Sequence, residues 1–170
     1  MGVDQRGLRA RYRDAAAVNI VLHRDAEIIA WVRERSPDPL VREYGFGPCS
    51  AIGVSDGVKL VAGVVYHEYR GHSIQLSMAS ESPRWCTRRT LRALLGYPFK
   101  QLHVARITAC TAKSNTALRS LVDRLSFRLE GTIRCGLDGK QDLLIYGLLR
   151  EEAEQWITDH EKRTASTASA

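Results

Sequence analysis

The segment SMASESPRWCTRRTL, residues 77–91, holds residues suited to binding an anion. Alternating apolar residues before it predict a strand, and leucines at helical spacing after it predict a helix. The first turn of a helix exposes unpaired backbone N–H groups and a partial positive charge. Arg84, Arg88 and Arg89 surround this turn. The segment therefore predicts a phosphate or pyrophosphate site, and the alternative is a basic surface helix without a ligand.

A second segment, NTALRSLVDRLSFRLEGTIR at residues 115–134, predicts a short helix that runs directly into a strand. Ser114 or Asn115 is a natural N-cap, because a short polar side chain can accept a hydrogen bond from the first helical turn. The segment is either ordinary helix–strand packing, with Asn115 serving only as a cap, or the second wall of a cofactor site.

The elements that must position these segments follow from the periodicity of the apolar residues. Asp56-Gly57 predicts a hairpin turn, and Pro98 predicts a kink or an end to its helix near Tyr97. The patterns predict, in order, a strand at 17–23, a helix at 25–35, a Pro/Gly-rich loop at 36–48, strands at 49–55, 58–69 and 73–79, an amphipathic helix at 82–102, a strand at 104–112, a helix at 114–127, strands at 128–136 and 142–150, and a polar helix at 151–163.

The chain has 170 residues, which is enough for one domain with a substantial core. We expect a basic arm at 1–14, a single mixed α/β domain at 15–155, and a polar helix end with a disordered tail at 156–170. No apolar run approaches the roughly 20 residues of a membrane-spanning helix, and the N-terminus lacks a secretory signal. These features predict a cytoplasmic protein that does not bind a membrane.

The charge and the cysteines limit the choice of partners. The formal net charge of +6 favours an anionic partner, but the sequence shows neither a DNA-reading helix nor a dense basic face, so no motif supports a nucleic-acid role. The four widely spaced cysteines predict reduced thiols and no metal site. They are Cys49, Cys86, Cys110 and Cys135.

The motifs LRALLGYPF, NTA, RLSFRLEGTIR and YGLLREE occur in an order and spacing that resemble the Gcn5-related N-acetyltransferases (GNAT). The similarity covers about residues 18–155. It is greatest to the branch that acetylates protein N-terminal amines and to acetyltransferase-like proteins encoded in phages and prophages. It implies the acyl-CoA N-acyltransferase fold, with a mixed, mostly antiparallel sheet of about six to seven strands flanked by helices.

The resemblance implies an acetyl-CoA site between two central parallel strands that splay apart. The pantetheine arm would bind the backbone of Leu76, Ser77 and Met78, and Asn115 would line the cofactor. The pyrophosphate would lie at the next helix N-terminus. The residues expected to bind it are Arg84, Trp85, Cys86, Thr87, Arg88 and Arg89.

The sequence departs from the family pattern at four positions. Pro83 and Trp85 replace the two glycines of the phosphate loop, and the bulky Trp85 could block the pyrophosphate or stack on the cofactor. Ser126 replaces a glycine, which has a cost if its φ is positive. Val122 replaces a tyrosine that protonates the leaving thiolate in many members, a residue that the N-terminal-amine branch often lacks.

The implied reaction is attack of a neutral amine on a thioester, which needs a backbone N–H near Met78 to polarise the carbonyl and a base to remove a proton. Glu81 is the nearest carboxylate by sequence, with His67 and Glu68 as rivals, and Asn115 is the other residue expected at the reaction centre. The acceptor is a protein N-terminus, a lysine, a small amine or a modified nucleobase. Loops at 36–50 and around Asp138 would form its site, and the chain could act as a homodimer.

The second hypothesis is a binding module that keeps the fold and has lost catalysis. The replacement of the phosphate-loop glycines by Pro83 and Trp85 is its main support. Such a module would act through a protein or nucleic-acid partner, with the basic arm as part of the contact.

Overall fold

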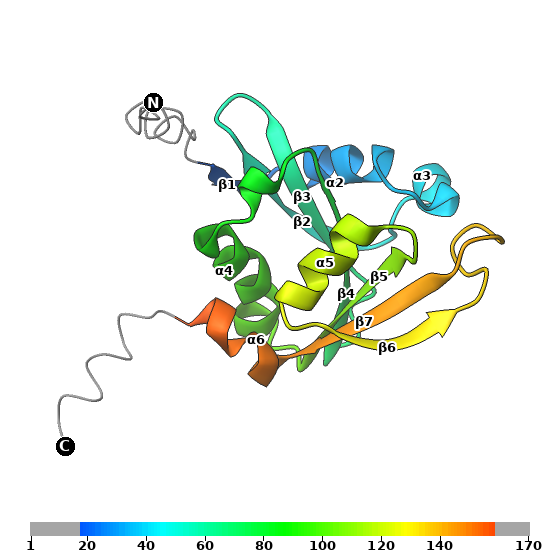
Figure 1. Cartoon of the computed structure of the whole chain (residues 1–170). Helices are drawn as coiled ribbons and strands as arrows, with labels where there is room; N and C mark the ends of the chain where they lie inside the picture. The colour runs from blue at the N-terminus through cyan, green and yellow to red at the C-terminus, as the bar shows by residue number, and fades with distance from the viewer. Residues whose placement is uncertain (1–17, 159–170) are drawn as a thin grey trace, which may run out of the picture.

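A single mixed sheet of seven strands forms the centre of the protein (Figure 1), as the computed structural model of residues 18–158 shows. The strand order is β1-β2-β3-β4-β5-β7-β6, and only the β4–β5 pair is parallel. The strands are β1 (Asn19–Val21), β2 (Cys49–Ser55), β3 (Leu60–His67), β4 (Ser73–Ser80), β5 (Arg106–Ala112), β6 (Arg128–Ile133) and β7 (Leu143–Leu149). The predicted mixed, mostly antiparallel sheet is confirmed.

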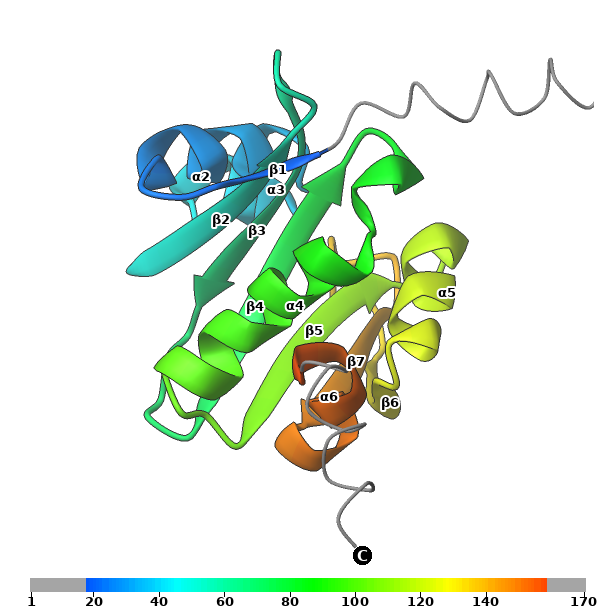
Figure 2. The ribbon, with the colours of Figure 1, turned by 90° about the vertical axis from the view of Figure 1, so that its left-hand side faces the viewer.

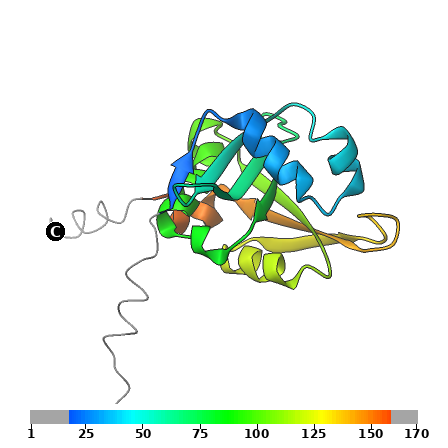
Figure 3. The ribbon, with the colours of Figure 1, turned by 90° about the horizontal axis from the view of Figure 1, so that it is seen from above.

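Helices cover both faces of the sheet. In Figure 2, α4 (Arg88–Gly96) and α6 (Arg150–Ile157) lie on the face towards the viewer, and α2 (Asp25–Glu34) and α3 (Pro39–Tyr44) lie behind. Figure 3 shows α5 (Thr116–Arg124) on the opposite side of the sheet from α2 and α3. No helix within residues 18–158 has the length and apolar character needed to cross a membrane. The predicted arm at 1–14 and most of the predicted tail at 156–170 lie outside the described residues.

The prediction of a continuous loop at 36–48 is wrong, because this segment contains α3. The Asp38 carboxylate accepts a hydrogen bond from the Leu40 N–H, and Pro39 occupies the first helical turn, where its missing N–H has no cost. Gly45 ends the helix at a φ of 80°, in the left-handed region that glycine tolerates. Local capping therefore creates a short helix that proline content alone would have excluded.

The predicted helix at 82–102 is divided into three parts. A 3₁₀ turn at Pro83–Trp85 precedes α4, which begins only after Thr87, and a π-helical segment at Tyr97–Gln101 follows it. Thr87 and Thr90 form a reciprocal capping box at the start of α4. The expected end near Tyr97 is confirmed, because Pro98 cannot donate a helical hydrogen bond.

Two apolar cores hold the helices against the two faces of the sheet. The larger core lies under α4, α5 and α6 and includes Phe99, Ile107 and Leu148, each with no exposed surface. The smaller core lies under α2 and includes Ile28 and Val32. Gly63 on β3 lets α2 approach closely, since a Cβ there would lie 2.8 Å from Val32 Cγ2.

Candidate active site

The parallel strands β4 and β5 separate in the middle of the sheet. Their pairing runs only from Ser73–Arg106 to Leu76–Ala109. Beyond that point β4 remains paired with β3 as far as Ser80, and β5 remains paired with β7 as far as Ala112. β4 stays paired with β3 and β5 stays paired with β7, but β4 and β5 no longer pair with each other, so an opening forms between them. The expected splay is confirmed.

The Met78 backbone faces this opening. Glu81 N–H donates to the Val61 carbonyl at 2.9 Å, so this residue pair is a hydrogen-bonded pair of the β3–β4 ladder. Hydrogen-bonded and non-hydrogen-bonded pairs alternate along an antiparallel ladder, which makes the pair of Met78 and Val64 a non-hydrogen-bonded one. The Met78 N–H and carbonyl therefore point away from β3, towards the gap where β5 has diverged.

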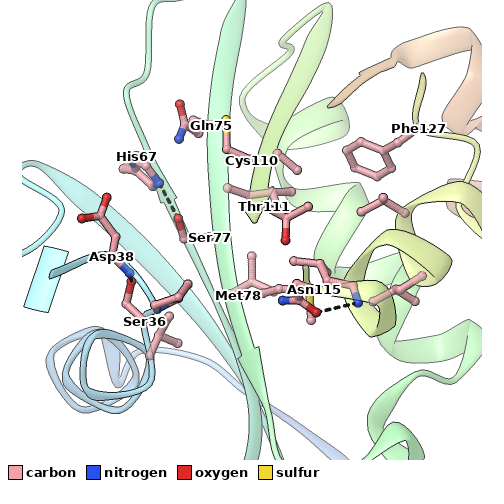
Figure 4. A pocket seen from close by; sticks show the side chains of 18 of the residues that line it. Ser36, Asp38, His67, Gln75, Ser77, Met78, Cys110, Thr111, Asn115 and Phe127 are labelled. Carbon is pink, nitrogen blue, oxygen red and sulfur yellow. Dashed lines mark hydrogen bonds between the residues drawn. The ribbon is translucent and has the colours of Figure 1, made fainter. Parts of the chain in front are cut away.

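A cavity of about 190 Å³ passes through the opening. Figure 4 shows Ser36, Asp38 and the His67–Ser77 pair on the left, and Asn115 and Phe127 on the right, with Met78 and Thr111 between them. Of the predicted site residues, the structure brings together Leu76, Ser77, Met78, Trp85 and Asn115 as lining residues.

Asn115 is both a helix cap and a cavity residue. Its Oδ1 accepts a hydrogen bond from the Leu118 N–H at 3.1 Å. Figure 4 shows this oxygen directed at the helix and the side-chain nitrogen directed away from it. The cap uses only the oxygen, so the two Nδ2–H groups can still donate to a ligand. The two readings of Asn115 from sequence are therefore compatible.

Separating the two roles of Asn115 needs two variants. Asn115→Ala removes both, and we expect it to lower the free energy of unfolding by roughly 0.5–2 kcal/mol and to raise KM for acetyl-CoA. Asn115→Ser retains the cap but not the amide donors, so it should raise KM without the loss of stability. Thermal unfolding and initial rates would measure both effects, and a normal KM in Asn115→Ser would leave Asn115 with the cap alone.

Two backbone N–H groups of the segment expected to bind pyrophosphate already donate hydrogen bonds within the segment. The Cys86 N–H donates to the Pro83 carbonyl at 3.1 Å, and the Thr87 N–H donates to the Trp85 carbonyl at 2.8 Å. The Trp85 side chain is 3% exposed and belongs to the core, so it does not cover the loop. The N–H groups of Arg88 and the next residue, which open α4, are those that a helix start leaves unpaired.

The arginine side chains around this segment have different environments. Arg88 donates to the Gln155 carbonyl at 2.6 Å and lies 5.9 Å from the Trp156 ring, so its guanidinium is directed at α6. Arg84 and Arg89 are exposed. Burial raises the pKa of the Cys86 thiol, against a smaller, lowering effect of the Arg124 charge on α5.

Glu81 does not line the cavity. Its carboxylate accepts from Lys59 Nζ at 2.7 Å and from Arg35 Nη2 at 2.9 Å. Both hydrogen bonds lower the pKa of Glu81, the one from Lys59 having the larger effect. A carboxylate that is bound by two cations and has a lowered pKa is a weak base, so the structure gives this residue a bridging role between α2, β3 and the end of β4.

Glu81→Gln is therefore expected to leave kcat and KM within about twofold of the wild type. The substitution removes charge from a partly exposed ion-pair cluster, whose members contribute little individually. Steady-state rates measure the effect, and a loss of kcat above about tenfold would restore Glu81 as the base.

His67 is a buried residue of the cavity lining. Its ring is 7% exposed, its Nε2 lies 2.9 Å from Ser77 Oγ, and the Phe46 ring lies 5.2 Å from it. Burial lowers the pKa of His67 from 6.5, against a smaller raising effect of Glu68. The imidazole is therefore neutral at pH 7 and can accept a proton. All residues of β3 are buried, so the sequence VVYHEY has no apolar–polar alternation that would assign a face to His67.

The other departures have local explanations. Ser126 has a φ of 70°, as its replacement of glycine suggested, and its hydroxyl accepts from Gln155 Nε2 at 2.9 Å. Val122 is buried and lines the cavity, so no side-chain acid occupies that place. Glu130 on β6 forms a 2.7 Å ion pair with Arg106 on β5. Among residues 18–158, no three His, Cys, Asp or Glu side chains are grouped to hold a metal ion.

The fold has counterparts in solved structures. The RimJ protein of Mycobacterium smegmatis, in complex with CoA-disulfide, is 18% identical and aligns over 91% of this chain and 90% of its own with a TM-score of 0.61. A GNAT-family acetyltransferase from Bacillus anthracis is 18% identical over 79% of this chain and 95% of its own, with a TM-score of 0.56. This chain has the GNAT fold. The predicted resemblance is confirmed at the level of the fold.

Other comparisons add a partial sequence match. The spermidine/spermine N-acetyltransferase SpeG of Vibrio cholerae is 15% identical over 82% of this chain and 98% of its own, with a TM-score of 0.62. A Bacillus subtilis protein named as a ribosomal N-acetyltransferase, YdaF, is 38% identical over 66 residues. The match spans 37% of this chain and only 36% of YdaF. No family model matches the chain.

Proposed function

We propose that the protein is an acetyl-CoA-dependent N-acetyltransferase that acts on a primary amine. The observation that carries this proposal is the splay of β4 from β5, which turns the Met78 backbone towards a cavity that Asn115 also lines. The match to a named N-acetyltransferase and the GNAT fold support the same activity.

The cavity residues fit the donor. The free backbone groups of β4 beyond Leu76 would bind the amide groups of the pantetheine arm, and Asn115 would donate to it from α5. The first-turn amides of α4 with Arg84 and Arg89 would bind the diphosphate. Acetyl-CoA supplies the acetyl group as an activated thioester. The Met78 N–H would donate to the thioester oxygen, where negative charge develops in the transition state.

His67 would remove the proton from the attacking amine, either directly or through the Ser77 hydroxyl that it contacts. Because its pKa is lowered, His67 binds a proton weakly, and an amine with a low pKa is therefore the better acceptor. An α-amino group has a pKa of about 7.7–8.0 and a lysine side chain about 10.4, so the α-amine is neutral far more often near pH 7. This difference favours the N-terminal amine of a peptide as the acceptor.

The test is acetyl transfer by the full chain. Acetyl-CoA would be incubated with the protein and a mixture of tetrapeptides that differ in the first residue. We expect the release of free thiol to depend on peptide, and mass spectrometry should find one acetyl group on the α-amine. Release of thiol without any acetylated amine would contradict the proposal.

A binding module without catalysis is the second candidate. The observation in its favour is that the Cys86 and Thr87 amides bond within their own loop rather than facing outward. In that case acetyl-CoA should not bind at all, whereas the enzyme proposal requires saturable binding.

A further inference from the structure

A second cavity continues from the first on the face of the sheet that carries α2 and α3. Its volume is about 510 Å³, within the range of about 300–1,000 Å³ typical of ligand pockets. Four residues line both cavities, namely Val41, Phe46, His67 and Gln75. His67 therefore stands where the second cavity meets the one that contains the Met78 backbone. An amine that reaches His67 through the second cavity leaves the rest of its molecule there.

Gln75 and Thr108 form the floor of the second cavity. They are register partners across β4 and β5, and Gln75 is also the register partner of His67 across β3 and β4. The Gln75 side chain is half-buried and makes no hydrogen bond with the part of the chain at 18–158. Thr108 Oγ1 accepts from Arg106 Nη2 at 3.2 Å, which leaves the Thr108 hydroxyl hydrogen free to donate.

The unused hydrogen-bonding groups of Gln75 and Thr108 match the donor and acceptor of a peptide group. A peptide group offers one N–H and one carbonyl, and the Gln75 amide can accept from the first while the Thr108 hydroxyl donates to the second. Directly opposed residues on neighbouring strands have Cβ atoms about 4.5–5.5 Å apart, so Gln75 lies close to His67. In a peptide, one Cα separates the α-amine from the first peptide group. In a lysine side chain, four methylene groups intervene.

The charges of the second cavity do not suit a polyamine. Its two charged side chains, apart from His67, are Glu68 and Arg70, which lie 3.5 Å apart and compensate each other. Arg106, which bonds Thr108, is paired with Glu130. A chain with several ammonium groups would need several unpaired carboxylates along its path, and these residues provide none.

We propose that Gln75 and Thr108 bind the first peptide group of the acceptor and so select peptide α-amines over other primary amines. This proposal rests on the proposed acetyltransferase function. The second cavity would hold the first residues of the acceptor, and the amine would lie between His67 and the thioester.

Gln75→Leu and Thr108→Val remove the hydrogen-bonding groups with little change in volume. The probes are the tetrapeptide mixture and n-propylamine, each with acetyl-CoA and the full chain. We expect each variant to lower the ratio of kcat/KM for peptides to kcat/KM for propylamine by about 3- to 10-fold, the loss typical of one neutral hydrogen bond. Thr108→Ser retains the hydroxyl and should retain the ratio.

An unchanged ratio in both variants would overturn the proposal. Acetylation of propylamine but of no peptide by the wild type would also overturn it, while the acetyltransferase function would stand. If neither amine were acetylated by the wild type, the proposed function would fail and this proposal with it. A thermal-unfolding curve for each variant separates loss of acceptor binding from loss of the fold.

Discussion

Replacing His67 with glutamine is expected to lower kcat by about 10²–10⁴-fold, the range for loss of a general base. Glutamine fills a similar space and can still bond the Ser77 hydroxyl, but it cannot accept a proton from the amine. Fixed-time assays with saturating acetyl-CoA and peptide would measure the loss of kcat. His72→Gln, on the exposed turn before β4, is the matched control and should retain the wild-type rate.

The pH dependence of His67 gives a second readout. Because burial lowers its pKa, the wild-type kcat should fall as the pH drops through a value below 6.5, and His67→Gln should lack that fall. Stability should change in the same direction. Below pH 6.5 the unfolded chain binds a proton that the folded chain resists, so the free energy of unfolding decreases as the pH falls through that range. A kcat profile of the same shape in both proteins would contradict the role of His67.

Replacing Met78 with proline is expected to lower kcat by about 10²–10³-fold, the loss typical of one oxyanion donor. Proline removes the N–H that faces the opening, and no hydrogen bond of the β3–β4 ladder depends on that group. The expected fall is in kcat more than in KM, because the bond strengthens only as charge develops on the oxygen.

Ser80→Pro is the matched control for Met78→Pro. Ser80 pairs with Ala62, so its N–H also points away from β3, but it lies at the end of β4. Proline there carries the same backbone restriction without removing the predicted donor. Equal falls in kcat for the two variants, with equal losses of thermal stability, would show that strand distortion rather than the Met78 N–H explains the effect.

Much of the fold was predictable from local patterns. Apolar alternation located the strands, Asp56-Gly57 located the first hairpin, and Pro98 located the end of α4, because each feature acts through neighbouring residues. The loop prediction at 36–48 is wrong, since three prolines and two glycines suggest a loop while the cap at Asp38 favours a helix. Proline at the first helical turn favours a helix rather than breaking it.

Only those residues of the candidate site whose place follows from their position in a strand or helix could be predicted from the sequence. Met78 lies near the end of β4 and Asn115 caps α5, so motif spacing was enough to place both residues on the cavity wall. Glu81 was placed at the reaction centre by proximity in sequence, but Arg35 and Lys59, which come from elsewhere in the chain, bind it. His67 contacts Phe46, which follows α3 in the chain, and no local pattern predicts this contact between distant segments.

Binding of the donor tests the central claim most directly. A thermal-unfolding titration of the full chain with acetyl-CoA should show saturable stabilisation, by roughly 2.7 kcal/mol at 100 times the dissociation constant. For a chain of this length, that corresponds to a rise of several degrees in Tm. Free pantetheine should give a smaller rise at the same concentration, because it lacks the diphosphate. No rise in Tm up to millimolar acetyl-CoA would mean that the opening beside Met78 does not hold the donor.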